Sequence, residues 1–263
     1  MNMLHFVMAA SLPLLGSTDK PTDDNHFNKS SLSITQTTTS NITETIQITD
    51  HYTLENHPDD YELTLGKYLL DVPLIKQNPE LKYGCEVTSL AMMLQYAGVN
   101  TSKMELYSNI KKDDDPIQRS SSGDILRWGN PAEGFVGDMT GKHAGYAVYD
   151  KPMEELVNRY LPNRAVNLTN HHFEEVLQHV AHGYPVVVWT TGDYRLPNRP
   201  ESWLHNNQTI TTPLDLHAVV LVGYDDYNVY INDPLSGKKQ YPVNKQQFIE
   251  SWKALQSRAI SFK

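Results

Sequence analysis

The sequence predicts an α+β domain, with helices in its first half and antiparallel strands in its second. Helical periodicity begins after Gly84 and recurs in three further segments before Gly183. After Gly183 the period changes to that of strands, in runs rich in valine and tyrosine. Between them, residues 120–149 are rich in glycine and aromatic side chains without periodicity, which predicts a long structured loop.

Apolar residues recur at helical spacing in four segments, 86–97, 101–111, 152–160 and 173–181. Gly98 follows the first segment and suits a C-terminal cap. Thr101 or Ser102 can cap the N-terminus of the second segment. The inward face of this second helix is expected to carry Met104, Leu106 and Ile110.

Strands are expected at 185–190, 218–224, 228–232 and around 239–241. The turn residues between Gly223 and Asn228 should join two of these strands in a hairpin. Asn244 should begin a last helix, and residues 258–262 are expected to return as an edge strand.

The N-terminal sixty residues differ from the rest. Residues 1–17 are apolar and end in small side chains, as a secretory signal does, and are too short to span a bilayer. They carry no Lys or Arg, so a disordered apolar start is the alternative. Residues 18–60 are rich in Ser, Thr and Asn, which predicts a disordered tether. A single domain is expected over 61–263, in an extracellular or cell-surface protein without an integral membrane span.

The net charge and the cysteine content limit the possible partners and the possible covalent cross-links. The formal net charge of -9 argues against nucleic acid as the main partner. The single cysteine, Cys85, cannot form an internal disulfide, and no cofactor is expected. The sequence carries no information on oligomeric state.

Cys85 stands where a turn meets an apolar helix, in Tyr83-Gly84-Cys85-Glu86. At the first turn of a helix the peptide dipole favours a thiolate. His217 precedes a buried-strand pattern, and Asp233 ends the next strand. If these strands form a hairpin centred on residue 225, His217 and Asp233 lie directly opposite each other, as an imidazole and its orienting carboxylate require.

An oxyanion donor is expected shortly before the nucleophile. The Gln77 side-chain amide, with the backbone N–H of Cys85, could form a two-donor oxyanion hole, and Asn78 is the alternative donor.

The chain after the tether resembles stand-alone bacterial papain-like cysteine peptidases, related to the bacteriocin-leader-processing peptidases. The matching segments are 72–77, 84–92, 128–131, 134–138, 217–220 and 232–234. The resemblance implies a papain-like fold whose nucleophile helix packs on a C-terminal antiparallel sheet. It also implies Cys85 as nucleophile, His217 as general base and acid, Asp233 as orienting carboxylate and Gln77 in the oxyanion hole.

The chain departs from these relatives in two ways. Many of them carry glycine directly after the cysteine, where this chain has Glu86, whose charge would oppose the thiolate. Transporter-fused relatives carry membrane spans and an ATPase, and neither is found here, so bacteriocin processing is not expected.

Aromatic residues are the candidate substrate contacts: Trp128, Phe135 and Trp189, with Tyr146 and Tyr149 as further possibilities. A metal site is not expected. The histidines at 171, 172, 179 and 182 lack a carboxylate at a convincing spacing, and residues 137–142 lack the glycine and hydroxyl of a phosphate loop.

The sequence therefore predicts a cysteine hydrolase that acts on a peptide or protein substrate through a thioester. Two alternatives stay open. An amine could capture the thioester, which gives a transpeptidase, or the module could bind peptide or cell-wall material without catalysis.

Overall fold

The computed structural model describes residues 66–197 and 200–263. The expected signal segment, 1–17, and the expected tether, 18–60, lie outside these residues. Within the described ranges, no helix combines the length and apolar character needed to cross a lipid bilayer. The helices are α1 (Cys85–Tyr96), α2 (Lys103–Asn109), α3 (Asp150–Tyr160), α4 (Phe173–Ala181) and α5 (Lys245–Ala254).

The strands form one large sheet and two small ones. Those of the large sheet are β1 (Tyr68–Leu69), β6 (Ala165–Asn167), β7 (Val186–Thr191), β10 (Leu216–Tyr224), β11 (Asn228–Asp233), β12 (Lys238–Asn244) and β13 (Ala259–Phe262). Those of the small sheets are β2 (Lys112–Asp113), β3 (Gln118–Arg119), β4 (Ile125–Arg127), β5 (Phe135–Val136), β8 (Pro200–His205) and β9 (Gln208–Pro213).

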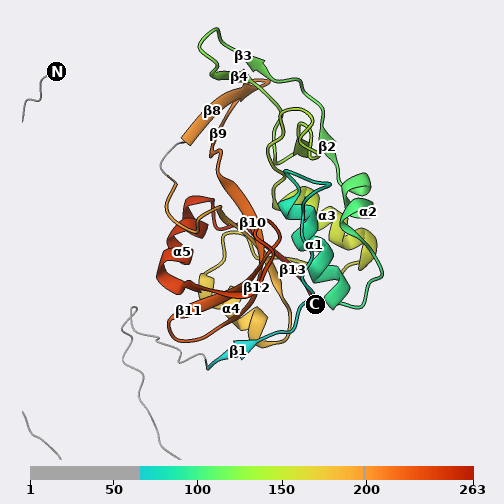
Figure 1. Ribbon diagram of the computed structural model, residues 1–263, viewed down its shortest axis with the longest axis vertical. Helices are drawn as coiled ribbons and strands as arrows, with labels where there is room; N and C mark the ends of the chain where they lie inside the picture. Colours follow the sequence, from blue (N-terminus) through green and yellow to red (C-terminus); the bar gives the residue numbers. More distant parts are fainter. Residues whose placement is uncertain (1–65, 198–199) are drawn as a thin grey trace, which may run out of the picture. The chain divides into compact units, whose positions relative to one another are not determined.

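The large sheet is antiparallel, with the order β12-β11-β10-β7-β13-β6, and β1 pairs with the far end of β10. Helices cover both of its faces (Figure 1). Successive side chains of β10 pack on opposite faces of the large sheet, because side chains alternate between the two faces along a strand. Ala218, Val220 and Val222 pack with α1 and α3, whereas Val219 and Leu221 pack with α4 and α5. The apolar run that follows His217 is therefore buried on both sides.

A four-stranded sheet, β3-β4-β8-β9, was not anticipated from the sequence. Figure 1 shows the β8–β9 hairpin reaching away from the large sheet. Its turn contains Asn206 at a φ of 53°, a left-handed conformation that asparagine tolerates better than most residues. The alternating run Ser202-Trp203-Leu204 and the Asn206-Asn207 pair were the signals that could have predicted this hairpin.

Three expectations about the elements were wrong. Residues 258–262 do not form an edge strand, because β13 lies between β7 and β6 and all four of its residues are buried. Met104 does not face inward, since it is 39% exposed. The long loop at 120–149 contains the short strands β4 and β5.

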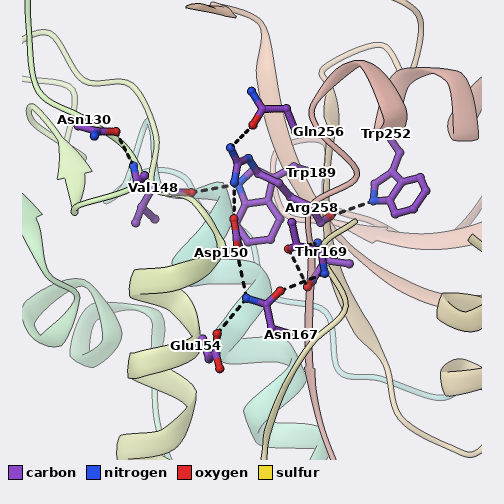
Figure 2. A network of polar contacts seen from close by, with 12 residues as sticks. Asn130, Val148, Asp150, Glu154, Asn167, Thr169, Trp189, Trp252, Gln256 and Arg258 are labelled. Atoms are coloured by element: carbon purple, nitrogen blue, oxygen red, sulfur yellow. Dashed lines mark hydrogen bonds and ion pairs between the residues drawn. The ribbon is translucent and has the colours of Figure 1, made fainter. Parts of the chain in front are cut away.

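A polar network attaches α3 to the sheet (Figure 2). Asp150, the first residue of α3, accepts hydrogen bonds from Arg258 and from Asn167 of β6. The Arg258 carbonyl in turn accepts from the Trp252 indole of α5, at 2.9 Å. This network fixes the residues just before α3, which contact the candidate site.

Candidate active site

Cys85 is the first residue of α1, and Gly84 is its N-cap. The turn before it is closed by backbone hydrogen bonds from Leu81 to Gln77 and from Gly84 to Leu81. A Cβ at residue 84 would lie 2.5 Å from the Leu81 Cβ, so this close turn needs glycine. The helix start thus holds Cys85 inward, and the residue is only 6% exposed.

The Cys85 thiol donates a hydrogen bond to the next side chain in the sequence. Its Sγ lies 3.3 Å from Oε2 of Glu86, which is completely buried. The other carboxyl oxygen, Oε1, accepts the backbone N–H of Val148 at 3.1 Å. The Val148 carbonyl accepts the indole N–H of Trp189 at 3.0 Å, as Figure 2 shows. Cys85, Glu86, Val148 and Trp189 therefore form one hydrogen-bonded chain.

Burial dominates the protonation of this pair. Burial, and then the Glu86 charge, raise the pKa of the Cys85 thiol well above its usual value, while the backbone N–H of Ala218 lowers it by less. Burial also raises the pKa of Glu86 to about 7, although backbone N–H groups and the thiol oppose the shift. Burial therefore favours the neutral thiol, in opposition to the helix dipole, which favours a thiolate.

His217 and Asp233 form a second buried pair. Nε2 of His217 lies 2.8 Å from Oδ1 of Asp233, and each residue is 3% exposed. Asp233 also accepts hydrogen bonds from the hydroxyls of Tyr194, at 2.8 Å, and Ser236, and from the backbone N–H of Leu235. Burial alone would raise the pKa of Asp233, but these donors and the His217 ring together hold it below its usual range.

The strand register differs from the expected one. The β10–β11 hairpin pairs Val220 with Asn232. If the same register is continued to His217, the residue opposite it is Leu235 and not Asp233. The register also shifts between Leu221 and Gly223, a β-bulge that a period-two count along the sequence cannot reveal. The error is two residues, which keeps the same face, so the carboxylate still reaches the imidazole.

The two pairs approach each other at Ala218, the residue after His217. The Ser89 hydroxyl of α1 donates to the Ala218 carbonyl at 3.1 Å, which docks the helix on β10. The Ala218 N–H acts on the Cys85 sulfur. Within residues 66–197 and 200–263, the Cys85 thiol hydrogen-bonds to the Glu86 carboxyl group. Nε2 of the His217 ring hydrogen-bonds to the Asp233 carboxylate.

Gln77 lies inside the molecule, only 2% exposed, whereas Asn78 is exposed. The backbone N–H of Gln77 donates to the carbonyl of Pro234, the residue directly after Asp233, at 2.9 Å. Its side-chain Nε2 donates to the Lys82 carbonyl at 2.8 Å, in the turn that leads to Cys85. The structure thus links Gln77 to both the Cys85 turn and the end of β11.

Sequence reasoning missed Tyr194 and Asn232 as supports of this site. Tyr194 follows β7 with a φ of 62°, and nothing in its sequence context connects it with Asp233. Asn232 is fully buried, donates to the Val72 carbonyl at 3.0 Å and accepts the Gln240 N–H at 2.8 Å. Its place directly before Asp233 was the available signal.

The three aromatic residues expected to contact substrate are buried, and their role as substrate contacts stays a prediction. Trp128 packs with Tyr146 and Trp203 and is 4% exposed. Phe135 and Trp189 are both fully buried in the core that surrounds α1. Large aromatic side chains bury much apolar surface when they pack in a core, as these three do.

The histidines considered for a metal site bond elsewhere. His171 pairs with Glu175, His179 contacts Ser261, and His182 contacts the Gln178 carbonyl. His172 is the N-cap of α4 and forms a capping box with Glu175.

A different cluster joins Asp113, Glu133 and His205, whose possible ligand atoms all lie within 4.8 Å of one another. The buried His205 ring lies 3.4 Å from Glu133 and 3.3 Å from Asp115. These residues are far apart in the sequence, so the sequence analysis did not find the cluster. It connects the β8–β9 hairpin with β2.

Comparison with known proteins agrees with this architecture. A model of the Peptidase_C39 like family matches residues 69–260. YvpB of Bacillus subtilis (strain 168), described as uncharacterized, is 37% identical over 193 residues, which are 73% of this chain and 74% of YvpB. A crystal structure of a candidate C39-like peptidase from Bacillus anthracis has a TM-score of 0.69 and 43% identity. It covers 75% of this chain and 97% of that chain.

The structural likeness shows that the fold is papain-like, with α1 packed on an antiparallel sheet. The family match extends from β1 into β13 and so includes every candidate site residue. The chain belongs to the Peptidase_C39 like family.

Proposed function

We propose that this protein is a cysteine peptidase or amidase that works through a thioester on Cys85. Membership of a C39-like peptidase family supports a cysteine peptidase-type activity and a peptide substrate. The observation that carries the proposal is the buried His217–Asp233 hydrogen bond beside the strand residue that contacts Cys85.

The proton path follows from which ring nitrogen is occupied. Nε2 of His217 is held by Asp233, so that Nδ1 is the nitrogen that takes the thiol proton and later gives it to the leaving amine. Asp233 fixes the ring and stabilises its protonated form. The new C–S bond forms as the carbonyl electrons move to oxygen, and the C–N bond then breaks to leave the thioester.

The oxyanion is assigned to the start of α1. The backbone N–H of Cys85 belongs to the first turn of the helix, where N–H groups have no intrahelical acceptor. The Gln77 amide uses one N–H on Lys82 and has a second for the oxyanion. Replacing Gln77 by Ala should lower kcat by about 100- to 1,000-fold.

The decisive experiment measures cleavage of a peptide library by the wild-type protein and by the variants Cys85→Ala and Asp233→Asn. Cys85→Ala should lower turnover by roughly 1,000-fold or more while the circular dichroism spectrum stays unchanged. Full activity of a folded Cys85→Ala protein would show that the thiol is not the nucleophile. Glu154→Gln, which removes an α3 carboxyl outside the candidate catalytic residues, serves as the control.

A transpeptidase is the second candidate, because burial of Cys85 to 6% exposure limits the access of water to a thioester. Product analysis with and without an added amine distinguishes the two reactions.

A catalytically silent peptide-binding module is the third candidate, supported by the neutral resting thiol. An electrophilic peptide probe that modifies Cys85 argues against this module.

We also propose an extracellular or cell-surface location and a distant relation to the bacteriocin-leader-processing peptidases. The apolar start of the sequence supports export. Mass spectrometry of the mature N-terminus in culture medium tests it, and an uncleaved, cell-internal protein would contradict it.

A further inference from the structure

Glu86 presents a carboxyl group directly to the sulfur atom that the proposed mechanism uses. The Cys85 thiol points at Oε2, 3.3 Å away, and the Val148 N–H holds Oε1. The Trp189 indole fixes the Val148 peptide from the other side. Because Glu86 is completely buried, its charge acts on the sulfur through a medium of low polarity.

We propose that Glu86 is a further catalytic residue, which controls whether Cys85 can become a thiolate. The ionised carboxylate accepts the S–H bond and holds the sulfur neutral. The protonated carboxyl, having taken its proton from solvent, instead donates a hydrogen bond to the thiolate. When the thiolate forms beside the protonated carboxyl, the proton that leaves sulfur goes to His217. The inference rests on the proposed role of Cys85 as nucleophile.

The surroundings place this change within the ordinary working range of pH. Burial raises the pKa of Glu86 to about 7, more than the N–H of Val148 and the Cys85 thiol lower it. Burial is the main cause that raises the pKa of Tyr146, on the loop before α3, and the nearby Glu86 charge adds to this shift by less. His217 is the titratable side chain on β10 that precedes the Ala218 contact.

Alkylation of Cys85 measures this control without any substrate. The rate of reaction with iodoacetamide is followed by mass spectrometry from pH 5 to pH 9.5, and the single cysteine makes the signal unambiguous. In the wild type the alkylation rate should rise with pH up to about pH 7 and then level off. Above pH 7 a higher pH still favours loss of the thiol proton, but it also ionises Glu86, whose charge disfavours the thiolate, and the two effects cancel. In Glu86→Gln the rate should continue to rise.

The ratio of the two rates is the quantity that tests the proposal. It should be constant below pH 6 and grow about tenfold per pH unit above pH 7, as one titrating carboxyl requires. His217 is present in both proteins, so the ratio isolates the effect of the Glu86 carboxyl. Glu154→Gln, which removes a carboxyl that accepts from Asn167, should follow the wild-type curve.

A rate ratio that does not change with pH would overturn the proposal. If Glu86→Gln does not fold, the wild-type curve decides: a continuous rise through pH 7 to pH 9 contradicts it, and a break that persists in His217→Asn supports it. Failure of the proposed function looks different. In that case the folded Cys85→Ala protein keeps its turnover, whereas the alkylation curves still report the coupling of thiol and carboxyl.

Discussion

At the scale of single residues, the site depends on what holds each carboxylate. Asp233 accepts from His217, Tyr194, Ser236 and a backbone N–H, and these bonds favour its ionised form. Glu86 accepts from the Val148 N–H and the Cys85 thiol in a fully buried position, where burial outweighs these donors and raises its pKa. Two carboxyl groups near one nucleophile are thus driven in opposite directions, as separate acid and base roles require.

Tyr194→Phe tests whether the Tyr194 hydroxyl orients the triad. Loss of its 2.8 Å bond to Asp233 should lower kcat about tenfold or more with little change in KM, because one donor to a charged acceptor is worth about 1.5–3 kcal/mol. The acid limb of the pH profile should also move upward, since the pKa of Asp233 rises. Tyr241→Phe, whose ring packs 6.4 Å from that of Tyr194, is the matched control. An unchanged pH profile would leave Tyr194 with a packing role alone.

Glu86→Gln should stabilise the protein in a pH-dependent way. The folded pKa of about 7 lies above the usual 4.5, so stability falls as pH rises from 4.5 to 7 and stays reduced above 7. The variant lacks this loss. Its free energy of unfolding relative to wild type should therefore increase by roughly 3 kcal/mol between pH 4 and pH 8. Urea denaturation at both pH values measures the difference, and Glu154→Gln should show a much smaller one.

At the scale of elements, the docking of α1 on β10 positions the nucleophile. The sequence predicted 173–181 with the bounds of α4 and placed the start of α1 within one residue, because apolar periodicity and glycine caps are local signals. It missed the β8–β9 hairpin, the bulge in β10 and the internal position of β13. These features depend on strand pairing across long stretches of sequence, which local patterns do not encode.

Gly223→Ala should loosen β1 from the sheet. A Cβ at residue 223 would lie 2.4 Å from the Tyr68 carbonyl oxygen, so the paired backbones must separate. The expected loss of stability is about 1–3 kcal/mol, measured by urea denaturation. Gly66→Ala is the control, since a Cβ there meets nothing within 4 Å. Equal stability of the two variants would mean that β1 contributes little to folding.

For the molecule as a whole, the sequence named the Cys85, His217, Asp233 and Gln77 positions, and their catalytic roles stay proposals. The structure joins His217 to Asp233 and places Gln77 against both the Cys85 turn and Pro234. The Tyr194 and Val148 contacts were beyond reach, because they come from loops whose path depends on the folded core.

Stability of the whole protein should be greatest in mildly acidic solution. The lowered pKa of Asp233 stabilises the fold above its usual 3.8, and this contribution is lost as pH falls further. Asp225, with a pKa lowered to about 2, acts in the same direction. Glu86 acts oppositely above 4.5. Urea midpoints from pH 3 to pH 9 should therefore peak between about pH 4 and pH 5.5, whereas a peak above pH 7 would contradict this balance.

The Val148 peptide has a spectroscopic consequence. Its carbonyl bonds the Trp189 indole, and its N–H bonds Glu86, so that one amide dipole connects a chromophore with a titrating acid. Ionisation of that acid changes the electric field along the amide, and indole emission is sensitive to such fields. Intrinsic fluorescence should accordingly act as an optical readout of the proton beside the sulfur, without any label.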